Sequence, residues 1–175
     1  MTKILQCISP IDGSVYLERE TLAPGAAFSS VARARAAQLD WAARPLQERV
    51  DLCLKAVAEV GQTVDRMAIE LAHQMGRPVR YGGEFGGFEE RALYMGKIAA
   101  SSLESLVIEE SSSFRRLIKR EPHGVIFVVA PWNYPYLIAV NALVPGLIAG
   151  NAVILKHATQ TLQVGERLAE AFHKV

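Results

Sequence analysis

Cysteine is scarce in this sequence. The 175 residues include two cysteines, Cys7 and Cys53, which lie far apart and belong to no spacing typical of a zinc site. A disulfide framework and a metal site therefore have no support. Sparse cysteine is the rule for a reducing compartment, so the expected location is the cytoplasm.

An excess of charge of one sign is also lacking. The chain carries 19 basic and 18 acidic residues, mixed along its length, for a net charge of +1. Such a chain has no field of one sign with which to attract nucleic acid or an anionic membrane. We expect no nucleic-acid partner.

The sequence also shows no export signal and no membrane span. The polar sequence from Ser9 follows the start of the chain before any apolar run of signal length develops. Residues 137–155 are long enough to cross a bilayer, but they contain two asparagines, a proline and a Gly150-Asn151 pair typical of a helix stop. We therefore interpret this stretch as buried helix and strand, with no membrane partner.

Apolar residues, by contrast, make up 50% of the chain, enough for one domain with a real core. Asp12-Gly13 between short apolar runs predicts a hairpin at residues 8–17. Alanine-rich composition predicts a helix at residues 25–43, and apolar periodicity predicts helices at 46–75 and 89–106. We expect Cys53 on the buried face of the second helix, and a flexible loop at the glycine-rich residues 82–87.

The pattern changes after Ser111-Ser112-Ser113. Residues 114–121 predict a solvent-facing strand, whereas residues 125–130 are continuously apolar, as in a strand covered on both faces. Strand then alternates with helix up to residue 175, which predicts a parallel βαβ unit with one further helix. We therefore expect an α/β fold: a hairpin and helical region at 1–113 and an incomplete dinucleotide-binding region at 114–175, together one incomplete domain.

The most informative motif follows the apolar strand and reads Pro131-Trp132-Asn133-Tyr134-Pro135. Downstream, a helix, the turn Gly150-Asn151 and a second apolar strand ending in Lys156 complete the pattern. This order resembles the Rossmann-like cofactor-binding region of the aldehyde dehydrogenase superfamily, and the similarity extends over the whole chain. Gly-x-Gly-x-x-Gly after a strand, the mark of other dinucleotide-binding domains, is absent from the sequence.

The resemblance implies roles for single residues. Asn133 would be catalytic, donating its side-chain amide to the oxyanion formed while an aldehyde is oxidised through a cysteine thiohemiacetal. Lys156 would bind the adenosine ribose of the cofactor. The implied cofactor contacts are Ala130, Pro131, Trp132, Lys156, Ala158 and Thr159.

One segment departs from the family pattern. The usual Lys-Pro-Ser/Ala-Glu is replaced by Lys156-His157-Ala158-Thr159, so a neutral Thr159 stands where a glutamate would repel a 2′-phosphate. We therefore expect NAD or NADP as cofactor, with NADP tolerated. His157 is interpreted as a surface or packing residue, and Thr161 as the N-cap of the last helix.

The resemblance also implies what lies outside this sequence. In the family the nucleophilic cysteine, the general base and a further phosphate-binding turn follow the position equivalent to Val175, and neither Cys7 nor Cys53 matches the nucleophile. We therefore expect an inactive amino-terminal fragment of an enzyme that forms homo-oligomers. The alternative is a truncated, non-catalytic homologue that serves as a dinucleotide-binding or interaction module.

Overall fold

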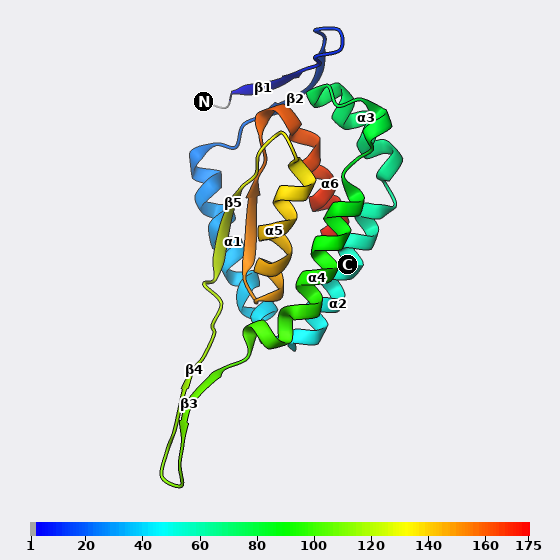
Figure 1. The fold of residues 1–175 in the computed structure, drawn as a ribbon. Helices are drawn as coiled ribbons and strands as arrows, with labels where there is room; N and C mark the ends of the chain where they lie inside the picture. The colour runs from blue at the N-terminus through cyan, green and yellow to red at the C-terminus, as the bar shows by residue number, and fades with distance from the viewer. Residues whose placement is uncertain (1–2) are drawn as a thin grey trace.

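The computed structural model describes residues 3–175. Met1 and Thr2, which the first predicted region includes, lie outside the described residues. The strands are β1 (Ile4–Ile8), β2 (Val15–Glu20), β3 (Leu106–Glu110), β4 (Arg115–Ile118), β5 (Val125–Val129) and β6 (Ala152–Lys156). The helices are α1 (Pro24–Ala43), α2 (Leu46–Gly61), α3 (Val64–Met75), α4 (Phe85–Leu103), α5 (Pro135–Ile148) and α6 (Leu162–His173), with short 3-10 turns η1 (Val79–Tyr81) and η2 (Thr159–Thr161). Together they form the α/β fold that the sequence predicts (Figure 1).

The predicted amino-terminal hairpin is confirmed. Strands β1 and β2 pair antiparallel on either side of the Asp12-Gly13 turn. The Asp12 carboxylate accepts hydrogen bonds from the backbone and hydroxyl of Ser14, at 3.0 and 2.7 Å. This local bonding explains why two turn-forming residues were a sufficient signal.

The single helix predicted over residues 46–75 is wrong, because the chain breaks into α2 and α3. The Thr63 backbone and hydroxyl both donate to the Val60 carbonyl, at 3.0 and 2.8 Å, which ends α2 in a tight turn. Both helices bury their apolar stripes in the same core. The hydrophobic periodicity therefore continues across a break that it cannot reveal.

Two further boundaries differ from the predictions. Helix α4 begins at Phe85 instead of residue 89, so Gly86 and Gly87 lie inside a helix and outside any flexible loop.

Helix α4 ends at Leu103. Strand β3, which was not predicted, follows it and pairs antiparallel with β4. The two strands form an arm that projects from the rest of the molecule (Figure 1). Every residue of both strands is exposed, so no burial pattern marks β3 in the sequence.

Strands β5 and β6 form the predicted parallel pair, in a register that joins Val125 to Ala152 and Val129 to Lys156. They lie side by side between α1 and α5 (Figure 1). The prediction that β5 is covered on both faces is wrong, because Phe127 and Val129 are each 64% exposed. One face of this short sheet packs against α5, where Gly146 lies close to Ile126 and Val153.

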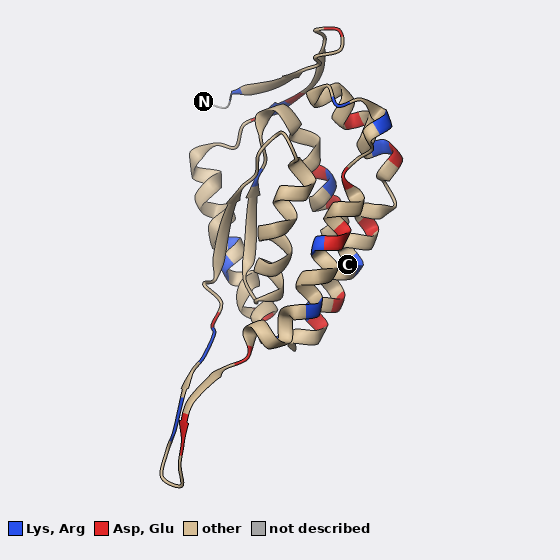
Figure 2. Cartoon of the chain, viewed as in Figure 1, with Lys and Arg blue, Asp and Glu red and all other residues tan. Residues whose placement is uncertain are grey.

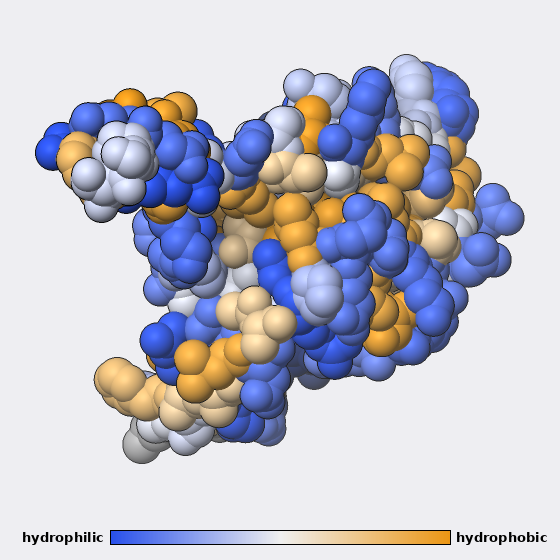
Figure 3. Space-filling view, turned by 90° about the horizontal axis from the view of Figure 1, so that it is seen from below, coloured by the Kyte–Doolittle hydropathy of each residue, from blue (hydrophilic) through white to orange (hydrophobic). Residues whose placement is uncertain are grey.

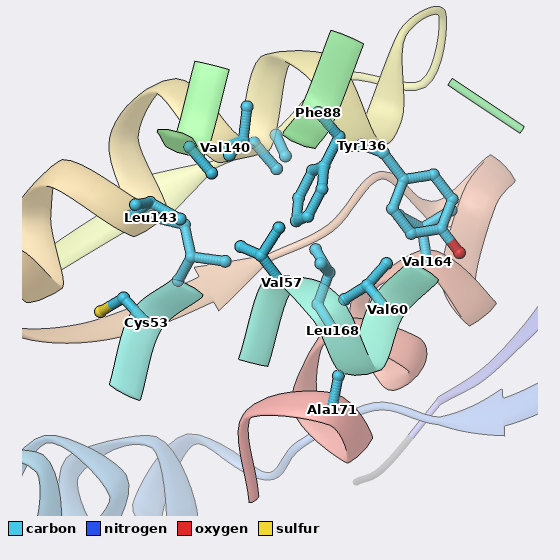
Figure 4. Packing of buried hydrophobic residues seen from close by; sticks show 14 of the residues in the cluster. Cys53, Val57, Val60, Phe88, Tyr136, Val140, Leu143, Val164, Leu168 and Ala171 are labelled. Carbon is cyan, nitrogen blue, oxygen red and sulfur yellow. The ribbon is translucent and has the colours of Figure 1, made fainter. Parts of the chain in front are cut away.

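The core lies where α2, α4, α5 and α6 meet (Figure 4). Cys53 and Val57 of α2 face Leu143 of α5, and Leu168 of α6 packs beside them. The Phe88 and Tyr136 rings join α4 to α5 edge to face, with centroids 6.3 Å apart. As predicted, Cys53 is buried. The core also joins residues from both predicted regions, 1–113 and 114–175.

The surface is mixed in charge and polarity. Figure 2 shows basic and acidic residues interspersed over the helices and along the β3–β4 arm. Seen from below, hydrophobic surface is bordered by hydrophilic residues (Figure 3). Within residues 3–175, no helix combines the length and apolar character needed to cross a membrane.

Candidate functional site

The carboxyl ends of β5 and β6 bring the predicted site residues to one edge. Val129 pairs with Lys156, and the Ala130 N–H donates to the Lys156 carbonyl at 3.1 Å. The loop 131–134 therefore begins beside the end of β6. Ligands of open parallel sheets collect at this edge, where strands end and helices begin.

The Gly150-Asn151 turn fixes the register of these strands. Gly150 has a φ of +90°, a conformation that favours glycine. The buried Asn151 side chain accepts from the Gly124 N–H at 3.0 Å and donates to the Gly146 carbonyl at 3.0 Å. The Asn151 side chain thus ties the start of β5 to the last turns of α5. Gly150 is explained by its positive φ, and Asn151 by these two hydrogen bonds.

The predicted site residues differ in exposure. Trp132, Asn133, Lys156 and Thr159 are exposed, whereas Pro131 and Ala158 are half-buried and Ala130 is buried. Trp132 exposes 48% of its surface, so it does not serve as a core residue. The exposed members are accessible to a ligand at the strand ends, and Ala130 forms part of the supporting backbone.

The Asn133 side chain does not cap helix α5. The residue at the N-cap position is Tyr134, which makes no side-chain cap bond. Asn133 contributes its backbone carbonyl, which accepts from Arg77 Nη2 at 2.7 Å. Among the described residues its side-chain amide has no partner, so that amide is free to donate to a ligand.

Two charged residues near Asn133 were missed by sequence reasoning. Arg77 and Glu84 form an ion pair in which the side chains are 12% and 4% exposed. Glu84 also accepts from the Tyr136 and Leu137 backbone amides, at 3.2 and 3.0 Å. The signal in the sequence was a single acidic residue among four glycines, Gly82, Gly83, Gly86 and Gly87.

A hollow of about 690 Å³ lies next to this loop. Tyr134 and Leu137 line it from the α5 side, and the segment from Tyr81 to Gly87 lines it from the other. Its wall is mostly apolar, with Tyr81, Phe85 and Tyr134 as aromatic members and the Arg77–Glu84 pair as charged members. A hollow of this kind suits the carbon chain of a small molecule.

His157 was predicted to be either a surface residue or a packing residue. It is buried, so it is a packing residue. The backbone N–H of Ala158 donates to Nδ1 at 3.2 Å, and the Thr161 hydroxyl lies 3.3 Å from the same atom. Burial lowers the pKa of His157 to about 4, the Pro135 backbone opposes this shift and Lys156 adds to it. Thr161 occupies the N-cap position of α6, as predicted, but its side chain makes no cap hydrogen bond.

Both thiols are buried. Burial raises the pKa of Cys53 to about 12 and also raises the pKa of Cys7. The Cys7 thiol donates to the carbonyl of Gln160, within η2, at 3.1 Å. Since the thiolate is the reactive form, these surroundings disfavour either cysteine as a nucleophile.

Comparisons with known proteins identify the family. The sequence profile of the aldehyde dehydrogenase family matches residues 2–175. An N-succinylglutamate 5-semialdehyde dehydrogenase of Novosphingobium aromaticivorans is 32% identical over 153 residues, covering 82% of this chain and 31% of the relative. A 4,4'-diapolycopene aldehyde oxidase of Methylomonas sp is 29% identical over 174 residues, covering 96% and 33%. The chain spans about a third of the length of these curated relatives.

Solved structures show the same fold. The NADP-dependent glyceraldehyde-3-phosphate dehydrogenase from Bacillus halodurans C-125, complexed with NADP, superposes with a TM-score of 0.89 at 24% identity, covering 98% of this chain and 37% of that one. An NAD-dependent benzaldehyde dehydrogenase from Corynebacterium glutamicum gives a TM-score of 0.89 at 23% identity, covering 98% and 38%. Because the family profile matches nearly the whole sequence and the fold agrees, this chain belongs to the aldehyde dehydrogenase family.

Proposed function

We propose that the whole protein in which this chain acts oxidises an aldehyde to a carboxylic acid with NAD or NADP. The supporting observation is the shared sheet edge, where the Ala130 N–H bonds to the Lys156 carbonyl at 3.1 Å and brings the Asn133 loop beside Lys156. This chain would supply the oxyanion donor and part of the cofactor site. A cysteine outside these 175 residues would be the nucleophile, because Cys7 and Cys53 are buried.

Asn133 would stabilise negative charge on the oxygen of the aldehyde. Its amide is a neutral donor, it is exposed, and its backbone is held by Arg77. A neutral, fixed donor stabilises an oxyanion without having to lose a proton or a partner first. The apolar hollow beside Tyr134 and Leu137 would accept the carbon chain of the aldehyde.

The residues at the strand ends fit a dinucleotide. Lys156 is exposed and would donate to the ribose hydroxyls, and the exposed Trp132 and Thr159 would line the same cleft with Pro131 and Ala158. The neutral Thr159 leaves room for a 2′-phosphate without repulsion, so NADP would be tolerated alongside NAD. A bound dinucleotide would supply the hydride acceptor, and these residues would hold and orient it.

Calorimetric titration of the protein with NADP+ and NAD+ tests the cofactor assignment. Loss of the Lys156 ammonium in Lys156→Ala should raise the dissociation constant about tenfold, the usual effect of losing one hydrogen bond from a charged donor. Lys97→Ala is the matched control, because Lys97 is an exposed lysine on α4. Equal constants for the two variants would contradict the proposal. Cofactor binding without aldehyde-dependent turnover in the whole protein would instead favour a non-catalytic dinucleotide-binding module.

A further inference from the structure

The first turn of α5 receives its hydrogen bonds from an unusual source. A helix begins with backbone N–H groups that lack partners within the helix. Pro135 has no N–H, and the Ile138 N–H donates to the Tyr134 carbonyl at 2.9 Å. The two remaining donors, Tyr136 and Leu137, both bond to one carboxylate oxygen of Glu84, at 3.2 and 3.0 Å. A side chain distant in sequence thus completes the start of this helix.

Glu84 is held in place by its own surroundings. Its φ of +69° makes it the one residue other than glycine with positive φ among residues 3–175. A Cβ at Gly83 would lie 2.8 Å from the Met67 side chain, and one at Gly87 would lie 3.0 Å from Leu137. The absence of side chains there lets the start of α4 approach both α3 and α5. A backbone conformation that costs energy, kept by close packing, indicates a role for the residue that adopts it.

Arg77 connects Glu84 to the loop that carries Asn133. One guanidinium nitrogen, Nη1, pairs with Glu84 Oε1, and the other, Nη2, donates to the Asn133 carbonyl at 2.7 Å. The Arg77 guanidinium also lies over the Tyr134 ring, 4.9 Å from its centroid. Asn133 is therefore fixed on one side through its own carbonyl, and on the other through the helix that follows it.

We propose that Arg77 and Glu84 form a positioning clamp that orients the Asn133 side chain for catalysis. The inference rests on the proposed function, because it takes Asn133 to be the oxyanion donor. Both residues also line the hollow assigned to the aldehyde chain, but the clamp requires no contact with the aldehyde or the cofactor. Their part is to hold the backbone from Asn133 to Leu137, so that the Asn133 amide keeps one direction.

Hydrogen exchange on this chain tests whether the clamp exists. In Glu84→Ala, exchange of the Tyr136 and Leu137 amides should accelerate about tenfold relative to later α5 amides, because both lose their acceptor. Glu84→Gln keeps one acceptor oxygen for the two amides but loses the ion pair with Arg77, so it should restore part of the protection. Exchange that is unchanged in Glu84→Ala would overturn the clamp, whether or not the enzyme assignment holds.

A matched control separates the clamp from general destabilisation. Glu70 and Arg167 form another buried ion pair, with side chains 6% and 8% exposed, which joins α3 to α6. Glu70→Gln should speed exchange in α3 and α6 without singling out Tyr136 and Leu137. A selective effect on these two amides in the control would also overturn the proposal.

Turnover of the whole protein tests the positioning role. Arg77→Lys keeps the charge but cannot reach Glu84 and the Asn133 carbonyl with two nitrogens at once. It should lower kcat about tenfold or more, with KM for the cofactor unchanged, since misplacement of a catalytic group costs mainly kcat. An unchanged kcat, in a protein that Asn133→Ala disables, would overturn positioning while leaving the oxyanion assignment intact. If Asn133→Ala itself retained turnover, the oxyanion assignment and the positioning role would both fall, and the exchange data would still decide whether the clamp exists.

Discussion

Asn133 is the residue on which turnover depends most in the proposed function. Its side-chain amide is exposed, and no described residue competes for it. Replacing it by alanine should lower kcat of the whole protein on the order of a hundred- to a thousandfold, the usual cost of one oxyanion donor. The dissociation constant of NADP+ should stay the same, because Lys156 remains. Steady-state kinetics measure kcat, and a cofactor titration measures the dissociation constant. An unchanged kcat, or a raised dissociation constant, would contradict the prediction.

His157 gives the folded chain a pH dependence that can be measured. Its folded pKa of about 4 lies below the ordinary value of 6.5, so the unfolded chain binds this proton more readily. The stabilising contribution is complete above pH 6.5 and is lost as the pH falls toward 4. From about pH 7.5 to about pH 5, this residue should lower the free energy of unfolding by about 2 kcal/mol.

The matched variant for this residue is His157→Asn. The asparagine oxygen can accept from the Ala158 N–H, as Nδ1 does, but it does not titrate in this range. Urea unfolding at the two pH values should therefore show a smaller drop for the variant. Parallel drops in both proteins would mean that other groups dominate the acid response.

The sequence pointed to candidate site residues where a local motif marks their positions. Asn133 lies shortly after β5 and Lys156 ends β6, and the parallel pairing brings them to one edge. Arg77 and Glu84 escaped because their partners lie 56 and 52 residues away, at Asn133 and Tyr136. No periodicity in a single sequence encodes such a long-range contact.

Other segments hold helix α5 at both ends. Glu84 binds its first amides, and at the other end Trp41 Nε1 donates to the Leu147 carbonyl at 2.7 Å and Arg49 Nε to the Ile148 carbonyl at 2.9 Å. The orphan carbonyls of the last turn therefore have partners from α1 and α2. This helix has little freedom to shift along its axis.

Asn151→Ala should weaken the link between α5 and β5. The variant removes the acceptor of the buried Gly124 N–H and one donor to Gly146. The free energy of unfolding should fall on the order of 2 kcal/mol, the cost of a buried polar group left without a partner. Asn141→Ala is the control, since the exposed Asn141 bonds within its own helix, to the Leu137 carbonyl. Equal losses in urea titrations would show that the Gly150-Asn151 turn has no special role.

At the level of elements, apolar runs gave the correct types and less accurate boundaries. The βαβ unit was predictable because β5, α5 and β6 are each strongly apolar or bounded by Gly150-Asn151. The α2–α3 break was not predictable, because the apolar stripe continues across it. Strand β3 was not predictable either, because all its residues are exposed. A local turn at Thr63 made the break, and pairing with β4 made β3 a strand.

The whole molecule carries an arm that contributes little to its own core. Residues of β3 and β4 are exposed throughout, and several are large and apolar: Leu106, Val107, Ile108, Leu117 and Ile118. We propose that the whole protein forms homo-oligomers through this arm, because apolar side chains on a projecting pair of strands would suit contact with another subunit.

Replacing residues 106–118 by a short Gly-Ser linker tests this role of the arm. The free energy of unfolding should change by less than about 1 kcal/mol, because few buried contacts are lost. The mass measured by light scattering should fall toward that of one subunit. An unchanged mass would exclude the arm as the main subunit contact, and a collapse of helical circular dichroism would show that it supports the fold.

The bonds that hold α5 at its ends also bear on how the chain is made. Trp41, Arg49 and Glu84 all precede α5 in the sequence. During synthesis they leave the ribosome before the helix that they bind. The earlier helices can therefore present ready partners to α5 as it emerges, and the loop with Asn133 takes its shape on a surface that already exists.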